Sequence, residues 1–143
     1  MRVRATVLLV RHHAVLLVRE RGGRWFLPGG EVGHGELPMN AAIRELYEET
    51  GAEASAAAFL WQQVSAHHIH HVFRVAIPAD VLPRAIFRTG IDEVRWVDVS
   101  QFANMPVTPG TRAILSRAAG GAGAARPTTW RDIGAGPGAS AGF

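Results

Sequence analysis

Short apolar runs separated by polar or glycine-rich breaks predict several strands along this chain. Residues 3–10 and 14–19 are rich in Val and Leu and flank Arg11-His12-His13, so we expect them to pair as a hairpin. Pro28-Gly29-Gly30 is expected to end a short strand at residues 25–27. Further strands are expected at residues 57–65, 68–77 and 94–99.

Two segments have the spacing of amphipathic helices. The first covers about residues 37–50, with Pro38 in its first turn and Gly51 after its last, as helix ends favour. The second follows Thr108 and Pro109 and continues to about Ala119. On the first helix we expect one face to enter the core, made by Met39, Ile43, Leu46, Tyr47 and Thr50. The element order predicts an α/β fold, with a mixed sheet between helices.

The chain length favours one domain at residues 1–119, followed by a tail at residues 120–143. Gly, Ala and Pro dominate the tail, a composition typical of flexible segments. Only Trp130 and Ile133 offer it strong apolar anchors. We expect them to dock on their own domain or on a second copy in a homodimer, the alternative being a tail that plays no part.

Composition limits the expected cellular compartment and binding partners of the protein. There is no cysteine, which excludes a disulfide framework and fits the cytoplasm. No apolar run is long enough to cross a bilayer, so we expect no membrane partner. All 15 basic residues are Arg, which would suit phosphate binding but which a coding bias explains better. Because they form no dense stripe, a nucleic acid is not an expected partner, except as a capped RNA end.

Glu45, Glu48 and Glu49 gather on the side of the first helix opposite its predicted core face. Carboxylates at this spacing repel one another, each pair by a few tenths of a kcal/mol. Within this helix only Arg44 offers a nearby positive charge, in reach of Glu48 four residues on. Mg²⁺ bound by oxygen ligands would account for the cluster, with Mn²⁺ as a substitute. An ordinary solvated acidic face is the alternative.

The segment from Gly30 to Ala52 resembles the Nudix box, G-x5-E-x7-R-E-U-x-E-E-x-G-U, where U is a bulky aliphatic residue. Seven fixed identities match, which by chance would occur on the order of 10⁻⁸ times per starting position. The one departure is Ala52, where a larger aliphatic residue is usual. The resemblance implies an α/β/α sandwich with a mixed sheet, and an enzyme that uses a divalent metal to hydrolyse a diphosphate linkage in a nucleotide.

The resemblance also implies a set of site residues. Metal ligands would be Glu45, Glu48, Glu49 and the carbonyl of Gly30. Glu36 and Arg44 would hold the carboxylates through charge-assisted hydrogen bonds, although ordinary salt bridges predict the same contacts. The glycine backbone at Gly29 and Gly30 allows a ligand to approach closely.

Three further residues are candidates for the chemistry. The resemblance makes Glu45 the group that orients or deprotonates the attacking water. Glu93 is the second candidate for the base, with a simple strand-edge charge as its alternative. Arg19, near the end of its strand, could reach a phosphate or could be solvated.

His67, His68, His70 and His71 invite a comparison with zinc sites. Strand alternation places His68 and His70 on one face and His67 and His71 on the other, so at most two can converge. A zinc site would need further ligands that the sequence does not show. The alternatives are a place in a substrate cleft or on the sheet surface.

The substrate is narrowed by two absences. No proline lies between Glu53 and Ile77, whereas Nudix members that act on ADP-ribose tend to carry a proline soon after the box. No tyrosine follows Tyr47, whereas members that act on dinucleoside polyphosphates tend to carry one. Two expectations remain: nucleoside triphosphates, including oxidised ones, or an orphan specificity for another substrate. Trp25, Phe26 and Trp61 could stack on a base or belong to the core. A nucleotide sensor that does not hydrolyse its ligand is the alternative function, but a sensor does not need every carboxylate of the box.

Overall fold

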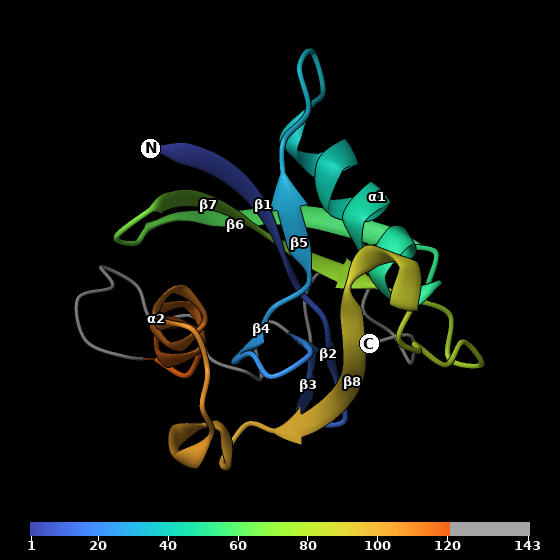
Figure 1. Cartoon of the computed structure of the whole chain (residues 1–143), viewed down its shortest axis with the longest axis vertical. Helices are drawn as coiled ribbons and strands as arrows, with labels where there is room; N and C mark the ends of the chain where they lie inside the picture. Colours follow the sequence, from blue (N-terminus) through green and yellow to red (C-terminus); the bar gives the residue numbers. More distant parts are fainter. Residues whose placement is uncertain (121–143) are drawn as a thin grey trace.

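A computed structural model of the chain describes residues 1–120, and in it two small sheets lie between two α-helices (Figure 1). The strands are β1 (Arg2–Leu8), β2 (Val10–Arg11), β3 (Ala14–Glu20), β4 (Trp25–Phe26), β5 (Gly29–Glu31), β6 (Ala56–Val64), β7 (His68–Ala76) and β8 (Ile91–Asp98). The helices are α1 (Pro38–Thr50), α2 (Pro109–Ala118) and the short 3-10 helices η1 (Phe87–Thr89) and η2 (Phe102–Asn104). None of the described helices could span a membrane. The predicted tail anchors Trp130 and Ile133 lie outside the described residues.

The first sheet has the order β5-β1-β7-β6 and is mixed, because β1 runs parallel to β7 while the other neighbours are antiparallel. The second sheet joins β2, β3 and β4, with β8 antiparallel to β3. Helix α1 lies on one side of the sheets and α2 on the other (Figure 1). The predicted α/β sandwich with a mixed sheet is therefore confirmed.

Strand β1 shows why the helices occupy opposite faces. Ala5 and Val7 belong to the core cluster that contains Leu46 of α1, whereas Leu8 belongs to the cluster that contains Ile114 of α2. Successive side chains of a strand point to opposite faces, so a strand that is apolar on both sides needs a cover on each. The continuous apolar run near the start of the sequence thus encodes a central strand.

The predicted hairpin is only partly correct. Val10 and Arg11 pair with β3 across a turn at His12 and His13, whose φ angles of 50° and 63° suit a two-residue hairpin. The earlier part of the same run, β1, instead pairs with β5 and β7 in the other sheet. One apolar run therefore supplies strands to two sheets, a division that local pattern does not reveal.

Helix α1 begins and ends as predicted, with Leu37 as its N-cap, Pro38 in its first turn and Gly51 as a left-handed C-cap. Its predicted core face is only partly right. Leu46 and Thr50 are buried, but Tyr47 is 50% exposed and Ile43 is half-buried. The helix is rotated about its axis, so that the buried side also includes Ala41, Ala42 and Glu49. Small Ala side chains let this side lie close to the sheet.

This rotation changes the expected effect of truncating Ile43. We expect Ile43→Ala to lower the free energy of unfolding by about 1 kcal/mol, since a half-buried side chain loses few contacts. Leu46→Ala should cost about 2–5 kcal/mol, because Leu46 is fully buried in the α1 cluster. Urea denaturation of both variants measures the difference. Equal losses would contradict the rotated packing.

Candidate active site

Two glycines bring the backbone of β5 against its neighbours. Pro28-Gly29-Gly30 was expected to end a strand, but Gly29 and Gly30 begin β5 and pair with Thr6 and Ala5 of β1. Gly29 has a φ of 148°, and a Cβ there would lie 2.1 Å from the carbonyl oxygen of Ala5. A Cβ on Gly30 would lie 2.5 Å from the carboxyl carbon of Glu45. Glycine is therefore required at position 29, where the clash is with backbone, whereas a side chain at position 30 would displace the Glu45 carboxylate, which packs directly on the β5 backbone.

Glu49 is the buried member of the acidic cluster. The residue is only 8% exposed, and its carboxylate accepts a 3.0 Å hydrogen bond from the Gly29 N–H. Burial raises the pKa of Glu49 to about 8, against the opposing effects of the Gly29 N–H and of Arg4. The sequence placed Glu49 on an exposed acidic face, but the rotation of α1 puts it at the edge of the core.

Arg44 links the remaining carboxylates. Its Nε and Nη2 donate to the two carboxylate oxygens of Glu36 at 2.7 and 2.9 Å, and its Nη1 donates to Glu45 at 2.9 Å and Glu48 at 2.8 Å. The Arg44 guanidinium and then the Gly33 N–H hold the pKa of Glu36 at about 2. The same hydrogen bonds raise the pKa of Arg44. The contacts expected of Glu36 and Arg44 are thus present.

The oxygen atoms of Glu45, Glu48, Glu49 and the Gly30 carbonyl could hold a hard divalent cation. Within residues 1–120, however, no three acidic or histidine side chains converge closely enough to form a ready-made metal site. Glu45 and Glu48 instead share Arg44 as their counter-charge. Oxygen ligands of this kind fit Mg²⁺, which typically binds through a few carboxylates together with phosphates and waters.

Arg19 and Glu93 lie opposite each other in the β3–β8 pair and form an ion pair. The guanidinium of Arg19 also lies 4.7 Å from the ring centroid of Trp25, which is buried in the core. Neither Arg19 nor Glu93 lines the pocket beside the acidic cluster. Each would have to leave its partner to take part in the predicted chemistry.

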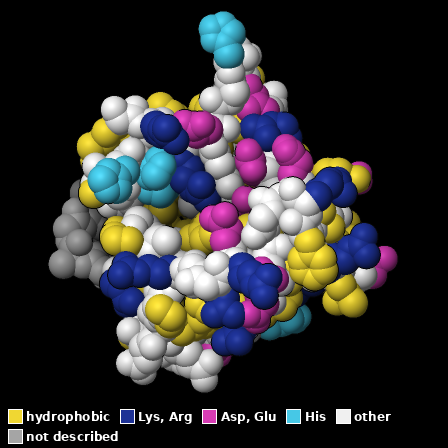
Figure 2. Space-filling view, in the orientation of Figure 1, with side chains coloured by type: hydrophobic (Ala, Val, Ile, Leu, Met, Phe, Trp, Pro, Cys, Tyr) yellow, Lys and Arg dark blue, Asp and Glu magenta, His cyan; other side chains and the backbone are white. Residues whose placement is uncertain are grey.

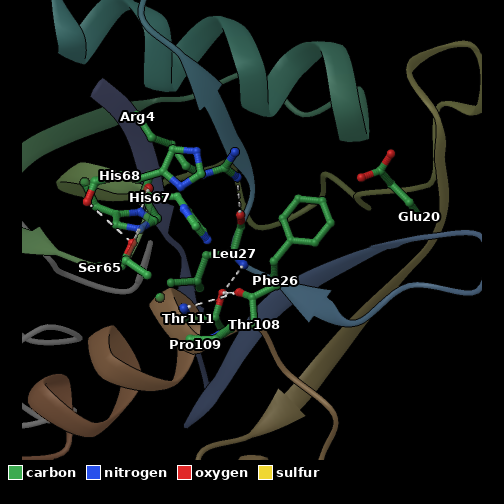
Figure 3. A pocket seen from close by; sticks show the side chains of 14 residues that line it. Arg4, Glu20, Phe26, Leu27, Ser65, His67, His68, Thr108, Pro109 and Thr111 are labelled. Atoms are coloured by element: carbon green, nitrogen blue, oxygen red, sulfur yellow. Dashed lines mark hydrogen bonds between the residues drawn. The ribbon is translucent and has the colours of Figure 1, made fainter. Parts of the chain in front are cut away.

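A pocket of about 380 Å³ opens near α1, although none of the α1 carboxylates lines it (Figure 3). Arg4 of β1 and Phe26 of β4 stand in it, with the guanidinium 5.5 Å from the ring centroid. Arg4 donates to the Leu27 carbonyl oxygen at 3.0 Å and is attracted by Glu49 and Glu45. Of the three aromatic candidates for stacking on a base, Phe26 lines this pocket, whereas Trp25 and Trp61 are core residues.

The histidines form one wall of the pocket. His68 and His70 share a face as predicted, with ring centroids 5.6 Å apart. The prediction was wrong for His67, which was expected on the opposite face but lies before β7, outside its alternation, and lines the same pocket. His70 is buried, with Nδ1 2.9 Å from the Thr6 hydroxyl and Nε2 3.1 Å from the Ser65 hydroxyl. Burial and then the charge of Arg4 lower the pKa of His70 to about 4, so its ring is neutral at pH 7. The described residues contain no zinc site here.

Several pocket residues escaped the sequence interpretation, namely Arg4, Thr6, Glu20 and Ser65. They come from β1, the end of β3 and the β6–β7 turn, and none lies in a motif. Alternation along β1 places Arg4 and Thr6 on one face, but nothing in the sequence shows that this face meets the histidines. Figure 2 shows the acidic side chains near α1 next to basic ones and to a pair of histidines on the same face.

An acidic helix packed on a glycine-containing strand, beside a pocket at the sheet edge, defines the class of protein as a Nudix domain. The family model described as "NUDIX domain" matches residues 1–118, and the chain belongs to this family.

Relatives and solved structures agree with this assignment. The chain is 32% identical over 117 residues to a Mycobacterium tuberculosis protein named "Putative 8-oxo-dGTP diphosphatase 3", covering 77% of this chain and 52% of the relative. This chain therefore spans about half the length of that relative. A Nudix family member from Chromobacterium violaceum has a TM-score of 0.73 at 28% identity, covering 83% of this chain and 77% of the other. The MutT Nudix hydrolase of Burkholderia pseudomallei has a TM-score of 0.69 at 26% identity, covering 80% and 95%.

Proposed function

We propose that this protein uses Mg²⁺, or Mn²⁺ in its place, to hydrolyse a diphosphate linkage in a nucleoside diphosphate derivative. The observation that carries the proposal is the acidic cluster of α1 held against β5 beside a pocket with an Arg and an aromatic side chain. Nucleoside triphosphates, oxidised ones included, are the proposed substrate class. The name of the Mycobacterium tuberculosis relative, "Putative 8-oxo-dGTP diphosphatase 3", supports this substrate class. The proposed compartment is the cytoplasm.

The metal would be held by Glu45, Glu48, Glu49 and the Gly30 carbonyl. When bound, it would neutralise charge that develops at phosphorus and make a bound water more acidic. To hold a cation, Glu45 and Glu48 would share carboxylate oxygens that accept from Arg44 in its absence. Glu49 would lose the proton that burial favours. The ligand set therefore fits a cation. Glu45 and Glu48 have only one guanidinium, that of Arg44, as their counter-charge, and a cation would add positive charge beside them.

The protein residues position the reactants around this centre. Glu45, fixed between Arg44 and the Gly30 backbone, orients the attacking water. Arg44 and Glu36 hold the carboxylates in place. Phe26 packs against the nucleobase, while Arg4, between the pocket and the acidic cluster, attracts the phosphates. Arg19 could contact a phosphate only after releasing Glu93, so we give it a secondary role in substrate binding.

A panel of substrates with Mg²⁺ or Mn²⁺ tests the proposal. It should include ordinary and oxidised nucleoside triphosphates, ADP-ribose, dinucleoside polyphosphates and a capped RNA end. We expect release of a phosphate-containing product from a nucleoside triphosphate, and no release when EDTA removes the metal. If no compound is hydrolysed but a nucleotide still binds, the sensor alternative replaces the enzyme.

Metal binding should be coupled to proton release. Because the pKa of Glu49 is about 8 without metal, this carboxyl is mostly protonated at pH 7 and must ionise to bind a cation. We expect Mn²⁺ binding at pH 7 to release about one proton, and the affinity to rise with pH up to the pKa of Glu49. Calorimetry in buffers of different ionisation enthalpy measures this release. Glu49→Gln should release none, and a wild-type protein that released none would contradict the assignment of Glu49.

A further inference from the structure

Most carboxylates near the pocket already have a hydrogen-bond or ion-pair partner. Glu36, Glu45 and Glu48 accept from Arg44, Glu49 accepts from the Gly29 N–H, and Glu93 is paired with Arg19. Glu20 is different. It is exposed at the end of β3 and lines the pocket, and within residues 1–120 its carboxylate has no hydrogen bond or ion pair.

Glu20, which lines the pocket, lies at a register shift in the β3–β8 pairing. Arg19 is opposite Glu93, but Glu20 is opposite Ile91, so Asp92 has no partner in this register. Irregularities of this kind redirect a side chain that regular alternation would point elsewhere. The Glu20 carboxylate then lies over Gly90, where an added Cβ would be 3.5 Å from Oε2.

The electrostatics place Glu20 near both parts of the site. Burial is the main cause of the raised pKa of Glu49 and of the lowered pKa of Arg4, and the charge of Glu20 adds a smaller effect on each, repelling Glu49 and attracting Arg4. In Figure 3, Glu20 stands apart from the other labelled side chains, with Phe26 between it and His68. Glu20 therefore lines the pocket within electrostatic reach of Glu49 of α1, and we expect the diphosphate of a bound nucleotide to lie between them.

We propose that Glu20 is the catalytic base that accepts a proton from the attacking water. This inference rests on the proposed function. The water oxygen forms a bond to phosphorus, and the bond from that phosphorus to the bridging oxygen breaks, its electron pair leaving with the departing phosphate. One proton of the water moves to the Glu20 carboxylate and is later lost to solvent.

The carboxylates that accept from Arg44, those of Glu36, Glu45 and Glu48, are less available for this proton, and Glu49 is assigned to the metal. Hydrogen bonds from cationic or N–H donors favour the ionised form of a carboxylate and weaken it as a base. Glu36 shows the effect, with its pKa held at about 2 by Arg44 and Gly33. Glu45 and Glu48 accept from the same guanidinium and are assigned to the metal. Glu45 can orient the water while Glu20 takes its proton.

The experiment compares Glu20→Gln and Glu20→Ala with wild type on the best substrate of the panel. Loss of a general base typically lowers turnover by about 10²–10⁴-fold, so we expect kcat to fall by at least about 100-fold while KM changes by less than about 3-fold. Glu20→Ala should regain activity with added formate, which can enter the space of the missing carboxylate. Glu53→Gln is the matched control, because Glu53 is exposed and follows α1.

Mn²⁺ binding, followed by electron paramagnetic resonance, is the second readout. We expect Glu20→Gln to bind Mn²⁺ as wild type does and to keep its Tm. A kcat within about 3-fold of wild type would overturn the proposal. So would weaker Mn²⁺ binding, which would make Glu20 a ligand, or a raised KM at unchanged kcat, which would make it a substrate contact. A wild-type protein that hydrolyses no diphosphate would overturn the proposed function as well, so the two failures differ.

Discussion

Glu49→Gln is expected to lower kcat by at least about 100-fold at saturating Mg²⁺, the largest loss among the single substitutions considered for α1. Substitutions that only support a metal ligand already cost about 10–100-fold, so removing a ligand should cost more. The Gln side chain keeps an oxygen that can accept from the Gly29 N–H, so the local packing survives. Steady-state rates and Mn²⁺ binding should therefore fall together while the fold persists.

Stability gives this variant its own control. Without metal, the pKa of Glu49 is about 8 in the folded protein but near its ordinary value of 4.5 in the unfolded chain. Between these values the folded state holds more protons, so wild-type stability should decrease as pH rises, and Glu49→Gln should remove this part of the decrease. Glu53→Gln should match wild type in every measurement. If Glu49→Gln hydrolysed the best substrate at the wild-type rate, Glu49 would not be a metal ligand.

Arg44→Ala is expected to lower kcat by about 10–100-fold, the range typical of groups that hold metal ligands in place. Arg44 donates to Glu36, Glu45 and Glu48, and its loss leaves three carboxylates together without their shared cation. Arg44→Lys should recover only part of the activity, because an ammonium group cannot reproduce the paired bonds to Glu36. Rates measured across a series of Mg²⁺ concentrations would show whether added metal compensates.

The control for Arg44 has to be chosen from the structure. Arg11 follows the first apolar run and was expected to be a simple turn residue, but it donates to the carbonyls of Ile77, Pro78 and Val81 and lies 5.3 Å from the Trp96 ring centroid. Arg11→Ala should therefore lower stability. Arg88 is exposed in η1, and Arg88→Ala should leave both rate and stability unchanged. An equal loss of activity in Arg44→Ala and Arg88→Ala would reduce Arg44 to a surface residue.

Local sequence predicted the helix that carries the acidic residues, but not which of them is buried. Pro38 and Gly51 fix the two ends of α1, because both act on backbone geometry near their own positions. The side of α1 that meets the sheet depends on the residues it packs against, and the Ala pair at 41 and 42 allowed an approach that placed Glu49 inside. The raised pKa of Glu49 follows from that placement and could not be predicted from the helix alone.

The histidine wall shows the same division. Strand alternation correctly paired His68 with His70, since it acts between residues two apart. The partners of His70, Thr6 and Ser65, come from β1 and from the β6–β7 turn, and the parallel pairing of β1 with β7 is what brings Thr6 to it. Parallel pairing between distant strands leaves no local signal in the sequence.

The sequence by itself determined the family, the two helices, most of the strands and the acidic residues of α1, because a fixed motif and short-range periodicity need no knowledge of distant residues. Only the tertiary structure decided that β1 and β2 serve different sheets, that Arg19 and Glu93 neutralise each other, and that Arg4 and Glu20 face the pocket. Glu20 owes its place to a register shift against β8, whose residues follow it by about seventy positions in the chain. Burial and charge pairing at this site arise from contacts between strands far apart in sequence, and those contacts exist only in the folded chain.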